Sequence, residues 1–151
     1  STLTYGFPYG QSKHRQVGWG LGGRMPYEAT RFLAAQGLEG NIFNDYGDGA
    51  FLIYHLYPKV RPVMDSRIDV YGSELAREYF ASRDDPLKFF QYLNKYNVAL
   101  ILLRKSQKNL QINQYLNYIP ATKLLLETKD RLLFTYDPEL LPPEILQPKA
   151  P

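Results

Sequence analysis

The chain has 151 residues, 44% of them hydrophobic and 22% charged, and a formal net charge of +3, which is the profile of a single globular domain with its own core. Its basic residues are scattered rather than grouped, which argues against the clustered basic face of a nucleic-acid-binding protein. The absence of cysteine excludes disulfides, thiolate chemistry and cysteine zinc sites, and no apolar run approaches the roughly 20 residues that span a bilayer.

Composition divides the chain into three parts. Residues 1–24 are rich in glycine and poor in apolar side chains, and because ordering glycine is entropically unfavourable we expect a flexible arm or linker there. Residues 25–137 carry the periodic apolar patterns of a single α/β domain. Residues 138–151 are rich in proline and predict an extended tail.

The domain is predicted to begin with a helix and a short strand. Pro26 suits the first turn of a helix over residues 26–36, because the missing N–H of proline has no partner at that position. Gly37 is the residue type that most often follows a helix C-terminus. Residues 41–44 then predict a short buried strand that leads into an acidic and glycine-rich loop.

A second helix and a second strand follow that loop. The run from Gly49 to about Tyr57 is apolar nearly all round, so we expect a helix that is buried on every side. Pro58 ends this helix, and residues 61–65 predict the second strand.

The second half of the domain supplies the rest of the sheet. We expect helices over residues 74–81, from Asp85-Pro86 to Asn97, and over residues 109–118. Residues 98–103 form a continuous apolar strand, and residues 123–127 and 132–136 form an antiparallel hairpin. The fold class predicted is a three-layer α/β sandwich, with a mainly parallel central sheet and a C-terminal antiparallel hairpin.

The densest group of chemically useful residues follows the first two strands. In extended backbone, Asp65, Arg67 and Asp69 lie on one face, so a guanidinium stands between two carboxylates. Two interpretations stay open: a salt-bridge corner that locks the second strand to the 44–48 loop, or a binding surface for a sugar or headgroup. The candidate binding residues are Asn44, Asp45, Tyr46, Asp48, Asp65, Arg67, Asp69 and Tyr71.

Other chemistry finds little support in the sequence. There is no phosphate-binding glycine loop, no nucleophile elbow, and no serine with a credible histidine partner. The two histidines, His14 and His55, are far apart in the sequence. Arg67, between Asp65 and Asp69, argues against a metal site made of carboxylate oxygens. We therefore assign no catalytic residue, no metal site and no cofactor.

The residues around this group resemble a known family. They are Pro26-Tyr27-Glu28-Ala29 with Phe32-Leu33, the run GNIFNDYGDGAFL at 40–52, Pro58, and the run VMDSRIDVY at 63–71. This pattern resembles the C-terminal soluble domain of bacterial multi-pass glycosyltransferase-like membrane proteins. That class depends on lipid-phosphate-linked sugars and includes protein mannosyltransferases and oligosaccharyltransferases.

The resemblance implies an extracytoplasmic, periplasmic domain whose catalytic acidic residue lies elsewhere, in membrane-side loops. Such a domain is non-catalytic alone and supports substrate positioning or stability. Its implied partners are its own upstream transmembrane region and a sugar or lipid-linked sugar. Two alternatives come from the residues themselves: a stand-alone interaction or homodimerisation module that uses its many tyrosines, or a small hydrolase that uses the paired carboxylates.

Overall fold

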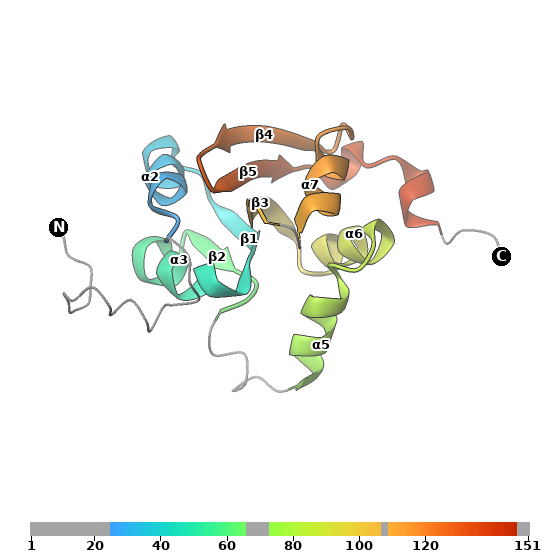
Figure 1. The fold of residues 1–151 in the computed structure, drawn as a ribbon, viewed down its shortest axis with the longest axis horizontal. Coiled ribbons are helices and arrows are strands. Elements are labelled where there is room, and N and C mark those ends of the chain that lie inside the picture. Colours follow the sequence, from blue (N-terminus) through green and yellow to red (C-terminus); the bar gives the residue numbers. More distant parts are fainter. Residues whose placement is uncertain (1–24, 66–72, 107–108, 148–151) are drawn as a thin grey trace.

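A five-stranded mixed sheet with helices on both faces forms the centre of the molecule (Figure 1). The computed structural model describes residues 25–65, 73–106 and 109–147. The strands lie in the order β2-β1-β3-β5-β4, with β1 parallel to β2 and β3, and β5 antiparallel to β3 and β4. Their bounds are β1 Gly40–Asn44, β2 Val60–Pro62, β3 Val98–Arg104, β4 Thr122–Glu127 and β5 Arg131–Tyr136. The α/β class and the C-terminal hairpin are confirmed.

The helices begin and end near the residues that the sequence indicates. They are α2 Tyr27–Gln36, α3 Gly49–Leu56, α5 Ser73–Ala81, α6 Pro86–Lys95 and α7 Leu110–Leu116. Gly37 ends α2 with a φ of 65°, a left-handed conformation that glycine adopts without steric penalty. Asp85 caps α6, because its side chain accepts a hydrogen bond from the backbone N–H of Lys88 at 2.9 Å.

Two apolar clusters lie on opposite faces of the sheet. Side chains of α2 and α3 cover one face, and the main members of that cluster are Ala29, Leu33, Ile42, Leu52, Leu100, Leu102 and Leu133. Side chains of α5, α6 and α7 cover the other, which is rich in aromatic residues: Phe43, Tyr79, Phe89, Phe90, Tyr92 and Phe134. Because β3 contributes to both clusters, its continuous apolar run is explained by burial on both sides.

The second strand is shorter than predicted. It ends at Pro62, whereas residues 61–65 were expected to be extended within the sheet. The N–H of Val63 still bonds to the carbonyl oxygen of Ile42 at 2.9 Å, but the next carbonyl, of Met64, is bound by a side chain instead of a strand neighbour. Asp65 therefore lies beyond the sheet, at its edge.

The helix α3 and the chain after β5 also differ from expectation. One side of α3 is exposed to solvent at Tyr54, as is Tyr57 directly after the helix, so the prediction that it is buried all round is wrong. After β5 the chain forms two short 3-10 turns, η4 Pro138–Leu140 and η5 Pro143–Leu146, although no regular structure was expected there. Leu141 between them is buried in the aromatic-rich cluster, which fastens this segment to the domain.

Candidate functional site at the carboxyl edge of the sheet

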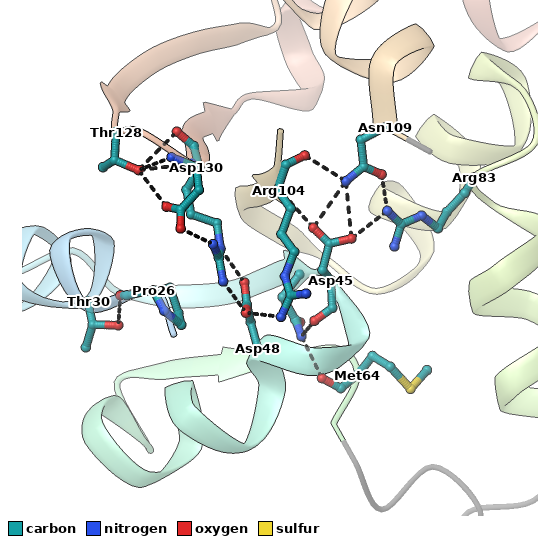
Figure 2. Close-up of polar contacts among 12 residues, drawn as sticks. Pro26, Thr30, Asp45, Asp48, Met64, Arg83, Arg104, Asn109, Thr128 and Asp130 are labelled. Atoms are coloured by element: carbon teal, nitrogen blue, oxygen red, sulfur yellow. Dashed lines mark hydrogen bonds and ion pairs between the residues drawn. The ribbon is translucent and has the colours of Figure 1, made fainter. Parts of the chain in front are cut away.

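One edge of the sheet collects the polar ends of three strands. Asn44 at the end of β1 lies opposite Leu102 of β3, and Arg104 at the end of β3 lies opposite Arg131 at the start of β5, so these strand ends share one edge. Between β1 and β3 the strand order reverses, and α/β proteins commonly bind ligands at this switch point. Side chains from four parts of the chain meet there (Figure 2), and we call them the carboxyl-edge cluster: Asp45, Asp48, Arg83, Arg104, Asn109 and Arg131.

Asp45 joins the ends of β1 and β3. Its Oδ2 atom accepts a hydrogen bond from the backbone N–H of Arg104 at 2.6 Å, and its Oδ1 atom accepts one from Nη2 of Arg83 at 2.6 Å. The side-chain amide of Asn109 donates to both carboxylate oxygens at 3.2 Å and to the carbonyl oxygen of Arg104 at 2.9 Å. The switch point is thus filled by contacts within the chain.

Asp48 is completely buried and is held by two arginines. Nε and Nη2 of Arg131 donate to its two oxygens at 2.9 and 2.7 Å, which is a bidentate ion pair, and Nη2 of Arg104 donates at 3.1 Å. Burial by itself lowers the pKa of Arg131, but the hydrogen bonds and the charge of Asp48 raise that pKa above its ordinary value. Arg131 therefore stays charged inside the domain.

The hairpin turn between β4 and β5 sets the position of Arg131. The N–H of Thr128 bonds to the carbonyl oxygen of Arg131 at 2.9 Å, and the N–H of Arg131 bonds back to Oγ1 of Thr128 at 2.9 Å. The carboxylate of Asp130 lies 3.2 Å from Nη1 of Arg131. This local closure places the guanidinium at the start of β5, where it faces Asp48.

Asn44 and Gly49 connect the end of β1 to the chain that leaves β2. The Nδ2 atom of Asn44 donates to the carbonyl oxygens of Asp45 at 2.9 Å and of Met64 at 2.7 Å. A Cβ atom on Gly49 would lie 2.1 Å from the carbonyl oxygen of Met64 and 2.5 Å from Cα of Asp65. Glycine is needed at the start of α3 because the backbone of the next segment passes directly against it.

Tyr79 links α5 to the same edge. Its hydroxyl donates to the carbonyl oxygen of Asn44 at 2.5 Å and accepts from Nη1 of Arg83 at 2.8 Å. Burial, the largest influence, raises the pKa of Tyr79, so its hydroxyl stays protonated and remains a donor. The ring stacks on Phe43 with a centroid distance of 5.3 Å. Tyr79 therefore joins the polar edge to the aromatic-rich cluster.

The structure brings together three of the eight residues predicted to form a site, and places two more beside them. Asn44, Asp45 and Asp48 belong to one hydrogen-bonded edge, and Asp65 is buried next to Gly49. Tyr46, half-buried in the turn before α3, tilts against Phe80 with 6.4 Å between ring centroids.

Arg67, Asp69 and Tyr71 lie outside the described residues, so the alternation of Asp65, Arg67 and Asp69 stays a prediction.

Sequence reasoning missed the cationic half of the cluster. Arg104 is the last residue of β3 and Arg131 is the first residue of β5, and antiparallel pairing of these strands brings both to one edge. The sequence predicted the hairpin of β4 with β5 but not the pairing of β3 with β5, so it did not bring these two positions together. Arg83 and Asn109 lie near the ends of other helices, and no local pattern points to them.

The contacts limit what the two carboxylates can do chemically. A general acid or base must come within hydrogen-bond distance of a proton on its substrate, about 3 Å. The side chain of Asp48 has no exposed surface, and 12% of the Asp45 side chain is exposed. Their oxygens are occupied by donors of the chain itself, so this edge is built as an internal ion-pair network.

Within residues 25–65, 73–106 and 109–147, no three histidine or acidic side chains are grouped so that they could hold a metal ion. None of the helices in these ranges is both long and apolar enough to cross a bilayer. Comparisons with family models, with curated proteins and with solved structures found no match to this chain.

Proposed function

We propose that this chain is the extracytoplasmic accessory domain of a glycosyltransferase-like integral membrane protein. It is non-catalytic alone, and it supports the positioning of a lipid-linked sugar or acceptor beside a catalytic centre in the membrane region. The motif at residues 40–71 suggests the family. The observation that carries the assigned role is the engagement of Asp45 and Asp48 by Arg83, Arg104 and Arg131.

These contacts favour a structural role for the carboxylates of Asp45 and Asp48 over a role in acid–base catalysis. Asp48 is shielded from solvent and Asp45 is bonded on both oxygens, so neither is presented to a substrate. Both instead tie β1 to β3 and β5. A domain that positions a substrate for a distant centre requires such a rigid edge, because a shift of about 1 Å in a positioned substrate can reduce a rate by about a hundredfold.

The motif residues outside the cluster support the same role. Asn44 and Gly49 hold the segment after β2 against the start of α3 through the carbonyl oxygen of Met64 and the backbone of Asp65. They fix the direction in which the chain leaves the sheet at residue 65.

The test uses the complete reading frame that contains this chain, expressed in membranes. Transfer of labelled sugar from a lipid-phosphate-linked donor is measured for the parent protein and for a form in which a flexible linker replaces residues 25–147. We expect the deletion to abolish transfer and the purified 151-residue chain to transfer no sugar. Asp45→Asn in the parent protein is expected to lower transfer, whereas Glu127→Gln, in an exposed ion pair with Lys105, serves as the matched control.

Two results would contradict the proposal. Undiminished transfer after deletion would remove any role of the domain in that reaction. Sugar transfer or glycoside hydrolysis by the purified chain, lost in Asp45→Asn, would replace the accessory role by a catalytic one.

A further inference from the structure

The outer side of α3 carries no charged residue. The helix has the sequence GAFLIYHL, and Phe51 and Leu52 point into the domain, where they are buried. On the other side Tyr54 is 80% exposed, and Tyr57, just after the helix, is 60% exposed. A helix that covers one face of a sheet normally carries charged and polar residues on its solvent side. The apolar sequence of α3 is therefore the one expected for a helix whose outer side is covered by a partner.

Two basic residues directly follow these tyrosines. Lys59 and Arg61 are exposed in the turn and edge strand after α3. The guanidinium of Arg61 is held in place, because Nη1 donates to the carbonyl oxygen of Pro58 at 3.1 Å and Nε donates to Oδ1 of Asn41 at 2.9 Å. Burial lowers the pKa of His55 below 6.5, so the imidazole is neutral at pH 7 and adds no charge to the helix.

We propose that Tyr54, Tyr57, Lys59 and Arg61 form a surface that binds the headgroup region of an anionic phospholipid bilayer. Tyrosine suits this boundary because its ring is apolar and its hydroxyl remains hydrated. Lysine and arginine next to it are attracted by the negative surface potential of the lipid. Figure 1 shows α3 at the margin of the domain beside the edge strand β2, and Tyr54 on that helix is exposed.

The charges favour lipid over a second copy of the chain. A two-fold dimer would place the same surface of both copies together, so the Lys59 and Arg61 side chains of both copies would share one interface. Glu39 is exposed at the neighbouring start of β1, but the two cations outnumber it. An anionic bilayer satisfies both cations and also takes up the tyrosine rings.

This inference goes beyond the proposed function and shares with it only the expectation of a membrane nearby. The test is flotation of the purified chain with vesicles of phosphatidylglycerol and phosphatidylcholine, against vesicles of phosphatidylcholine alone. Three variants are compared: Tyr54→Ser/Tyr57→Ser, Lys59→Gln, and the control Tyr118→Ser, which removes a tyrosine that is 84% exposed elsewhere. Circular dichroism checks that each variant is folded, and light scattering gives its mass.

We expect binding to the anionic vesicles only, weakened about fivefold by Lys59→Gln and roughly tenfold by the double tyrosine variant. Tyr118→Ser is expected to bind like the parent chain. The inference is overturned if the parent chain ignores anionic vesicles, or if Tyr118→Ser weakens binding as much as the double variant. It is equally overturned by a dimer that the double variant dissociates. If the parent chain does not bind anionic vesicles but sugar transfer still requires the domain, this inference is rejected and the proposed function stands.

Discussion

Oppositely charged pairs occur both at the carboxyl edge of the sheet and on the surface of α5 and α6, and the two regions use them differently. Asp48 and Arg131 at the edge have 0% and 3% of their side chains exposed, whereas Glu78 and Lys95 on the helices have 34% and 60% exposed. Breaking a buried pair leaves an uncompensated charge inside the protein. When an exposed pair is broken, water hydrates the remaining charge. The chemistry is the same, and burial decides whether the fold depends on it.

The largest effect is expected from Asp48→Asn. This change removes the buried carboxylate charge of Asp48 from Arg131, which should lower the free energy of unfolding by about 3–5 kcal/mol. Urea denaturation at neutral pH measures this difference. Glu127→Gln, which breaks the exposed pair with Lys105, is the control and should change stability by less than about 1 kcal/mol. Equal effects of the two substitutions would show that burial does not distinguish the regions.

A steric test of the same edge comes next in size. Gly49→Ala should destabilise the domain by about 1–3 kcal/mol or more, because the new methyl group overlaps the carbonyl oxygen of Met64. Alanine is favoured over glycine within a helix by about 1 kcal/mol, so propensity alone predicts the opposite sign. A thermal melt of the variant decides between the steric effect and helix propensity. A melting temperature at or above that of the parent would contradict the close contact.

Tyr79→Phe should have a moderate effect. It removes the hydroxyl that donates to the carbonyl oxygen of Asn44 and accepts from Arg83, while the stacked ring remains. The expected loss is about 1–2 kcal/mol in the free energy of unfolding, since a buried acceptor and a guanidinium lose a partner. Unchanged stability would mean that these two hydrogen bonds do not hold α5 to the edge.

The smallest effect is expected at Glu78. Hydrogen bonds from Lys95 and Tyr96 lower the pKa of Glu78 below its usual 4.5, so its contribution to stability is present above pH 4.5. That contribution is lost as the pH falls through the lowered pKa, and high salt should weaken it. Glu78→Gln should therefore make the acid limb of a stability–pH curve slightly shallower. A steeper acid limb in the variant would contradict the assigned sign.

The elements of the fold could be predicted because local signals define them. Gly37 ends α2, Asp85 and Pro86 start α6, and residues 98–103 are apolar without interruption. The short connection between the last two strands allowed only an antiparallel hairpin. Each of these features depends on residues close in the sequence.

The partners of the acidic motif could not be predicted in the same way. Asp48 and Arg131 are 83 positions apart, and only the pairing of β3 with β5 brings them together. The sequence placed Arg67 between Asp65 and Asp69, whereas the described contacts of Asp45 and Asp48 come from arginines further along the chain. The exposure of Tyr54 also escaped prediction, because an apolar periodicity does not state whether the second side of a helix is covered by its own chain.

One double substitution tests the central claim that Asp48 serves the fold. The free energy of unfolding in urea is compared for Asp48→Leu and for Asp48→Leu/Arg131→Met, each measured against the parent chain. If the pair is structural, the double variant should be clearly more stable than the single one, since apolar side chains replace both members of the buried pair, although Arg104 still loses its contact with Asp48. A double variant as unstable as Asp48→Leu alone would contradict the account.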